Sequence, residues 1–255
     1  MYSDAHTHLT GSPFGDNVLT PEEINIVLKN VREAGVSLIV AGSADLASAK
    51  RVAEIAAAED VVYASIGIHP WIASVLDDAT INGFLALAKQ PKVVAFGEIG
   101  LDESRSRASK EVQLQSLSQL LGISRETGLP PIIHQRGMHK EMMETIGREK
   151  APAGIMHGFS GDAVELQEWL DLGFLIAVGR AVLAPEGQGM KDVVQKIPAD
   201  RLVLETDGAN RTKEGKLEGQ ERVVQMAEVV ASWRGTTGPE IGETTTRNLK
   251  RLLKI

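Results

Sequence analysis

Apolar and β-branched residues gather in eight short runs, each of strand length and bounded by turn residues or by a helical pattern. The predicted strands are Ser3–Leu9, Ser37–Ala41, Val61–Ile68, Val93–Ile99, Pro131–Gln135, Gly154–Phe159, Phe174–Gly179 and Arg201–Asp207. Between them, apolar positions recur with the period of amphipathic helices. The predicted helices are Pro21–Glu33, Ala44–Ala58, Thr80–Lys89, Ser109–Thr127, His139–Arg148, Asp162–Leu170, Lys191–Lys196, Gln220–Arg234 and Glu240–Leu253.

Strands and helices alternate along the whole chain, and this alternation predicts parallel strands joined by right-handed crossovers. Eight units of about thirty residues fit a closed (β/α)₈ TIM barrel better than an open, doubly wound sheet. A dinucleotide-binding fold is disfavoured further because no G-x-G-x-x-G turn follows the first strand. With no linker or low-complexity tract, residues 1–255 are expected to form one α/β domain.

Composition narrows the class of protein. The net charge of −7 argues against a broad basic surface that grips duplex DNA, although it leaves room for a small nuclease site. The absence of cysteine excludes disulfides and thiolate metal ligands. We see neither a signal segment nor an apolar run long enough to span a bilayer, so we expect a cytoplasmic protein without membrane contacts. No strong dimer signal is present, which favours a monomer or weak oligomer.

Six side chains of metal-ligand type stand at or near the C-terminal ends of predicted strands, where barrels carry their active sites. The six are His6, His8, Glu98, His134, His157 and Asp207. His6 and His8 share one face of the first strand, so both imidazoles can reach one cation. Because a barrel brings its strand ends to one mouth, these nitrogen and carboxylate donors predict a site for two divalent cations.

Four neighbouring residues are expected to face the same mouth. Arg136 lies two positions beyond His134 and is suited to holding a phosphate or carboxylate. His69, at the end of the third strand, is a candidate substrate contact. Asp4 and Glu205 each lie two positions below a proposed ligand, deeper in the barrel, where a carboxylate can orient a ligand imidazole.

Six motifs, taken together and in this order, resemble those of the TatD family of metal-dependent hydrolases. They are Asp4-Ala5-His6-Thr7-His8, Gly67-Ile68-His69-Pro70, Gly97-Glu98-Ile99-Gly100-Leu101-Asp102, Ile132-Ile133-His134, His157-Gly158-Phe159-Ser160-Gly161 and Glu205-Thr206-Asp207. They span nearly the whole chain, and Arg247-Asn248 near its end is also similar. The resemblance implies a TIM-barrel metallohydrolase in a family whose members include magnesium-dependent DNases, often 3′–5′ exonucleases.

The resemblance also implies roles for the six ligand candidates. His6, His8 and Asp207 would hold one metal, His134 and His157 the other, and Glu98 would bridge the pair; magnesium, manganese and zinc all remain open. The fourth strand offers no inward lysine as an alternative bridge. Asp207 and Glu98 are the predicted catalytic residues, with Asp207 positioning a metal-activated water and taking its proton as that water attacks a phosphodiester.

Three stretches depart from the family pattern and concern the substrate, one of them Thr212-Lys213-Glu214-Gly215-Lys216-Leu217-Glu218-Gly219. Glu103 follows Asp102 where an aromatic residue is common, and Gly208-Ala209-Asn210-Arg211 replaces a proline and an aromatic. These segments shape the cleft, so hydrolysis is better supported than the substrate, expected to be a single-stranded DNA end or another phosphodiester. The alternatives are a small-molecule metallohydrolase acting on an ester, lactone or amide, and a non-catalytic binding protein. Arg105, Arg211 and Lys213 are further candidates for phosphate contacts.

Overall fold

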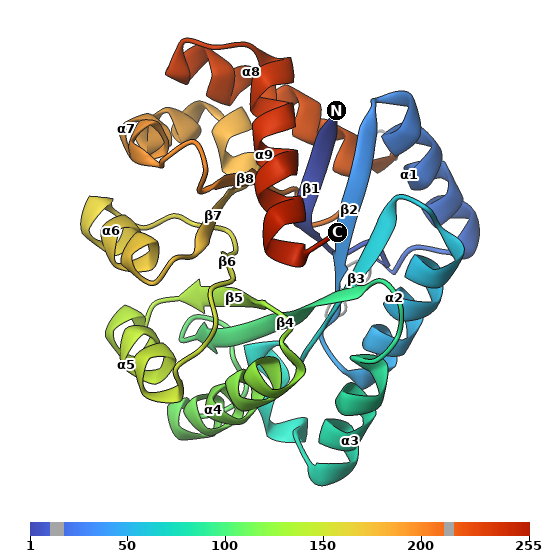
Figure 1. The fold of residues 1–255 in the computed structure, drawn as a ribbon, viewed down its shortest axis with the longest axis vertical. Helices are drawn as coiled ribbons and strands as arrows, with labels where there is room; N and C mark the ends of the chain where they lie inside the picture. The colour runs from blue at the N-terminus through green and yellow to red at the C-terminus, as the bar shows by residue number, and fades with distance from the viewer. Residues whose placement is uncertain (11–17, 212–216) are drawn as a thin grey trace.

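A barrel of eight parallel strands forms the centre of the computed structural model, which describes residues 1–10, 18–211 and 217–255 (Figure 1). Each strand pairs with the next in chain order, so the predicted (β/α)₈ barrel is confirmed. The strands are β1 Tyr2–Thr7, β2 Val36–Gly42, β3 Val62–Ile66, β4 Val93–Asp102, β5 Pro131–Arg136, β6 Ile155–Met156, β7 Leu175–Val178 and β8 Leu202–Leu204. Between β8 and β1, the Asp207 N–H donates to the His6 carbonyl at 3.1 Å.

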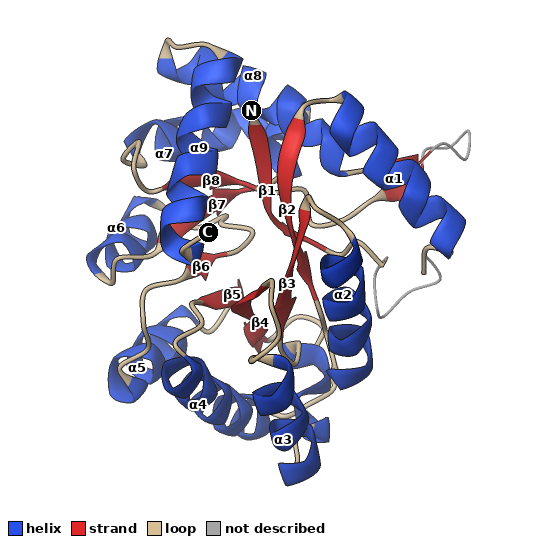
Figure 2. Cartoon of the chain, turned by 45° about the vertical axis from the view of Figure 1, so that its right-hand side comes forward, coloured by secondary structure: helices blue, strands red, loops and turns tan. Residues whose placement is uncertain are grey.

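Helices surround the barrel, as Figure 2 shows. They are α1 Pro21–Glu33, α2 Leu46–Ala58, α3 Asp78–Leu87, α4 Lys110–Thr127, α5 His139–Glu149, α6 Ala163–Asp171, α7 Lys191–Lys196, α8 Val223–Arg234 and α9 Gly238–Leu253. Short 3₁₀ turns are η1 Pro70–Val75, η2 Arg180–Leu183, η3 Pro185–Met190 and η4 Gln220–Arg222, and β9 Asn210–Arg211 pairs antiparallel with β10 Leu217–Glu218. The start of α1 follows the prediction, because Thr20 and Glu23 form a capping box around Pro21. Among the described residues, no helix combines the length and apolarity needed to cross a bilayer.

The largest differences from the predicted strand ends occur in β4, β6 and β8. The sixth and eighth strands were expected to run to Phe159 and Asp207, but β6 and β8 stop short of both. Left-handed backbone at Gly158 (φ 58°) and Asp207 (φ 59°) turns the chain out of the sheet there. In contrast, β4 continues to Asp102, because its last three residues pair with β5.

Helix α9 covers the end of the barrel at which the strands begin (Figure 1). Leu249 and Leu253 of α9 join the apolar cluster of residues such as Ala5 and Val40. Asn248 is buried and donates from Nδ2 to the carbonyls of Ala199 and Leu202 at 2.8 and 2.9 Å, at the start of β8. The asparagine of the family-like Arg247-Asn248 motif therefore anchors α9, and the opposite mouth is left for chemistry.

The first prediction concerns Gly100, where β4 passes very close to β5. A Cβ at Gly100 would lie 1.8 Å from the His134 carbonyl oxygen, and φ there is +158°. We expect Gly100→Ala to destabilise the fold by about 3 kcal/mol, because backbone must move to admit the methyl group. Gly122→Ala is the matched control: nothing lies within 4 Å of its Cβ in α4, so a gain of up to about 1 kcal/mol is expected. Urea unfolding measures both, and equal midpoints for Gly100→Ala and the wild type would contradict the prediction.

Candidate metal centre

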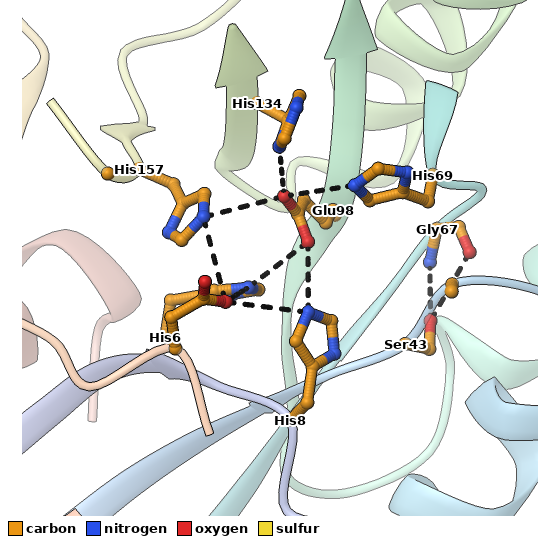
Figure 3. A network of polar contacts seen from close by, with 12 residues as sticks. His6, His8, Ser43, Gly67, His69, Glu98, His134 and His157 are labelled. Atoms are coloured by element: carbon orange, nitrogen blue, oxygen red, sulfur yellow. Dashed lines mark hydrogen bonds and ion pairs between the residues drawn. The ribbon is translucent and has the colours of Figure 1, made fainter. Parts of the chain in front are cut away.

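Glu98 lies at the centre of a buried group of imidazoles at the C-terminal mouth of the barrel (Figure 3). Its Oε1 lies 2.6 Å from His134 Nδ1. The Nε2 atoms of His157 and His69 each lie 3.5 Å from the same oxygen. Burial raises the pKa of Glu98, but the imidazoles of His69 and His157 lower it much more, so the carboxylate is ionised.

The second oxygen of Glu98 faces the first strand. Glu98 Oε2 lies 3.3 Å from His6 Nε2 and 3.2 Å from His8 Nε2. Asp207 Oδ1 approaches the same two nitrogens at 3.9 and 3.6 Å, and His157 Nε2 at 3.8 Å. The structure therefore brings all six predicted ligand candidates together around Glu98. His6, His8 and Asp207 lie close together on one side, and His134 and His69 lie on the other. His157 contacts both sides, because its Nε2 faces Glu98 Oε1 and Asp207 Oδ1.

The spacing of these donor atoms fits bound divalent cations. A cation with ligands at about 2.1 Å holds adjacent donor atoms roughly 3.0–3.5 Å apart. Most of the separations above lie between 3.2 and 3.9 Å, longer than charge-assisted hydrogen bonds. Within the described part of the chain, both ring nitrogens of His6 and Glu98 Oε2 are buried without a hydrogen-bond partner. Buried polar atoms left unpaired are costly, and a cation would satisfy His6 Nε2 and Glu98 Oε2.

His157 is oriented by Glu205, in the position predicted for a supporting carboxylate. Glu205 Oε2 lies 2.9 Å from His157 Nδ1, while Glu205 Oε1 accepts from the Gly158 N–H at 2.5 Å. With a proton on Nδ1, the Nε2 lone pair faces Glu98 and Asp207. Burial lowers the pKa of His157, but the charges of Glu205 and Glu98 outweigh this effect and raise the pKa to about 10. Metal uptake by His157 must therefore displace a proton.

Asp102 supports His134, and the sequence analysis did not assign it this role. His134 Nε2 lies 2.9 Å from Asp102 Oδ2, which also accepts from Trp71 Nε1 at 2.7 Å. Although burial raises the pKa of Asp102, the bonds from His134 and Trp71 hold it well below its ordinary value. Period-two alternation from Glu98 would have found Asp102, four positions on, had β4 been predicted to continue past Ile99.

Asp4 has a different hydrogen-bond partner from the predicted ligand imidazole. Its two oxygens accept from the backbone N–H of Thr206, at 3.0 Å, and from the Thr206 hydroxyl. Gln220 Nε2 donates to the Thr7 hydroxyl at 2.7 Å, and that oxygen lies 3.3 Å from Thr206 Oγ1. Burial raises the pKa of Asp4 to about 8. Asp4 therefore holds the residue before Asp207 and not a ligand imidazole.

The two predicted substrate contacts both stand at the mouth. His69 Nδ1 accepts from the Trp71 N–H at 3.2 Å, so the neutral ring carries its proton on Nε2, which faces Glu98. Arg136 is half-buried and donates from Nη1 to the carbonyls of Gln135 and Gly158 at 2.9 and 3.1 Å. Arg136 therefore keeps unused N–H donors for an anionic ligand, whereas the Nε2–H of His69 is directed at Glu98.

The candidate phosphate contacts on the loops are less defined. The Arg105 guanidinium lies 5.8 Å from the centre of the Trp71 ring, and Arg105 itself is exposed. Lys213 lies outside the described residues, and Arg211 is described only as a backbone position in β9.

A (β/α)₈ barrel with buried imidazoles and carboxylates at its C-terminal mouth defines a metal-dependent hydrolase of the TIM-barrel type. Residues 3–254 match the family described as TatD related DNase, and the chain belongs to that family. The expected resemblance is thereby confirmed.

Relatives of known sequence or structure agree with this family. The metal-dependent hydrolase YabD of Bacillus subtilis is 32% identical over 260 residues, covering 100% of both chains. A protein of Klebsiella pneumoniae named 3′-5′ ssDNA/RNA exonuclease TatD is 28% identical over 267 residues, covering 99% of this chain and 97% of the relative. The crystal structure of YJJV, a TatD homolog from Escherichia coli, superposes with a TM-score of 0.85 at 26% identity, covering 100% and 98%.

Proposed function

We propose that the protein is a divalent-metal-dependent phosphodiesterase that releases nucleotides from single-stranded DNA, in the 3′–5′ direction. The observation that carries the proposal is the position of Glu98, both of whose oxygens face imidazoles, His6 and His8 at Oε2 and others at Oε1. A single carboxylate in this position suits two adjacent cations, which are a recurrent arrangement in phosphodiester hydrolysis. The exonuclease names of relatives such as the Klebsiella pneumoniae protein support the substrate class.

Asp207 is suited to act as the general base. Its side chain is 46% exposed, whereas that of Glu98 is 2% exposed, so Asp207 faces the space in which substrate and water arrive. Its partial burial raises the pKa, but His157 and His8 lower it more, so Asp207 is ionised at neutral pH. Bound cations would acidify water and offset phosphate charge. Asp207 would hold the attacking water and accept its proton.

Two further residues would act on the phosphate itself. His69 lies against Glu98, and Arg136 ends β5 two positions beyond His134, with most of its N–H groups unused. Hydrogen bonds from these donors would grow stronger as negative charge builds on the phosphoryl oxygens. Such bonds favour the transition state over the bound substrate.

A small-molecule substrate is the second candidate, and one cavity favours it. A space of about 480 Å³ beside the mouth is lined by Asp102, Glu103, Lys110, Met138 and Glu141, among others. Its size is within the range of small-ligand sites, and its lining carries both charges and an apolar side chain. An ester, lactone or amide of nucleotide size would fit this description. A binding protein without activity has least support, because the complete donor set is present.

The deciding experiment uses short single-stranded DNA labelled at either end, with magnesium or manganese, beside the Asp207→Asn variant. We expect the wild type to remove nucleotides one by one from the 3′ end, so that the 3′ label is lost. The variant should remove almost none. Retention of both labels by a wild-type protein that binds two metal ions would overturn the nuclease proposal. Small esters and amides would then be the substrates to assay.

A further inference from the structure

Two arginines flank the metal centre in the same manner. Arg136 ends β5, and its Nη1 donates to the Gly158 carbonyl at 3.1 Å. Arg180 follows β7, and its Nη1 donates to the Gly208 carbonyl at 3.3 Å. Each of these glycines comes directly after a candidate metal ligand and has positive φ, 58° at Gly158 and 111° at Gly208. Each arginine is thus fixed to the loop that leaves the site at the end of the following strand.

Neither arginine has an acidic partner among the described residues, although both are half-buried. Elsewhere in the protein, Arg32 and Arg148 pair with carboxylates. A guanidinium has five N–H donors, so the carbonyl bonds leave most of them unused. A partly desolvated cation without a counter-charge is unfavourable, and a bound anion would supply that charge.

Among the other arginines that bind carbonyls without a carboxylate, Arg51 also binds a loop carbonyl, that of Leu19, but two others have a different setting. Arg125 binds the carbonyl of Glu149 at the end of α5, and Arg234 binds those of Val194 and Ile197 at the end of α7. The C-terminal end of a helix carries partial negative charge, which stabilises a cation there. Gly158 and Gly208 lie in loops, so no helix end provides that charge to Arg136 or Arg180.

We propose that Arg180 binds a second phosphodiester group of the substrate, next to the one being cleaved. The inference rests on the proposed nuclease function and on the anchoring of the guanidinium groups. Arg136 is bound to Gly158, after β6, and Arg180 is bound to Gly208, after β8. These two strands are two positions apart in the sheet, so the two binding points are separated by about 10 Å across the rim. That separation is too wide for one phosphate and suits two phosphates of one strand. Arg180 is thus a specificity residue that favours polynucleotides over single phosphodiesters.

The test compares a thymidine dinucleotide, which has one phosphodiester, with the trinucleotide, which has two. We expect the wild type to have a lower KM for the trinucleotide. Arg180→Gln should raise the trinucleotide KM about tenfold, with kcat changed less than twofold, because one charge-assisted contact is lost. The KM advantage of the trinucleotide should then disappear, and Arg180→Lys should keep part of it. The salt dependence of log kcat/KM should also become shallower by about 0.7.

The outcomes separate this inference from the proposed function. Arg125→Gln, which removes a carbonyl-bound arginine on α4, is the control and should keep the trinucleotide advantage. Suppose that the wild type cleaves both substrates. If Arg180→Gln then keeps the ratio of the dinucleotide KM to the trinucleotide KM, or loses kcat equally on both substrates, the inference alone is overturned. An equal loss of kcat on both substrates would mean that Arg180 only holds the Gly208 loop beside Asp207. A wild type that cleaves neither substrate would overturn both proposals.

Discussion

Replacing Glu98 with glutamine is expected to weaken metal binding and to lower turnover by more than about 10³-fold. Among the described residues, Glu98 is the one carboxylate with imidazoles against both of its oxygens. Glutamine keeps the size of the side chain but removes the negative charge, and its amide N–H₂ cannot act as a ligand. We therefore expect the metal content after dialysis to fall from about two ions per chain to one or fewer.

The same substitution should destabilise the metal-free protein. The ionised Glu98 neutralises the protonated imidazoles packed against it, above all His157, whose pKa is raised to about 10. Removal of one partner from a buried charge cluster costs about 3–5 kcal/mol. Urea unfolding in the presence of a chelator measures this loss directly.

The control for Glu98→Gln is Glu103→Gln. Glu103 is an exposed carboxylate five positions further along the same strand and loop, and the same chemical change there should leave metal content and stability unaltered. Full metal content in Glu98→Gln after dialysis would contradict a bridging role. Metal analysis and steady-state kinetics on the same samples would separate loss of metal from loss of chemistry.

The sequence predicted the barrel and the meeting of its ligand candidates because both depend on simple periodicity. Strand–helix alternation requires a parallel sheet, and parallel strands bring their C-terminal ends to one mouth. His6, Glu98 and His134 were therefore placed together from their positions at strand ends alone. Their assignment to particular metals remains a prediction from the family.

The supporting residues were harder to predict because they depend on where strands stop. β4 runs on to Asp102 through pairing with β5, which brings that carboxylate behind His134. Asp4 was assigned to an imidazole by alternation in β1, but its two oxygens accept from the Thr206 N–H and hydroxyl instead. Arg180 follows a predicted strand without any motif, and only its bond to Gly208 distinguishes it.

Asp207→Asn is expected to lower kcat by about 10²–10⁴-fold while part of the metal stays bound. Asparagine is nearly isosteric and tolerates the left-handed backbone at this position, where φ is 59°, so the β8 loop should keep its path. The amide oxygen can still contribute to metal binding, but the side chain can no longer accept a proton at neutral pH. The variant thus removes the base without removing the site.

The pH dependence of the residual activity tests this assignment further. Burial raises the pKa of Asp207, but His157 and His8 lower it more. The pKa of Asp207 is therefore below its ordinary value. The wild type should therefore keep its base ionised through neutral pH and lose kcat/KM only on acidification, as the carboxylate is protonated. In Asp207→Asn this acid limb should be absent, whereas a role in structure alone would lower the rate without changing the profile.

Asp200→Asn provides the matched control, since Asp200 is an exposed carboxylate just before β8, at the other end of that strand. It should retain the wild-type rate and the acid limb. If Asp207→Asn turned over at the wild-type rate with metal bound, proton transfer would have to pass to another group. Glu98 would be a poor replacement, because its side chain is 2% exposed and both of its oxygens face imidazoles. We therefore expect the loss of a proton acceptor to lower kcat most at Asp207, the exposed carboxylate of the metal centre.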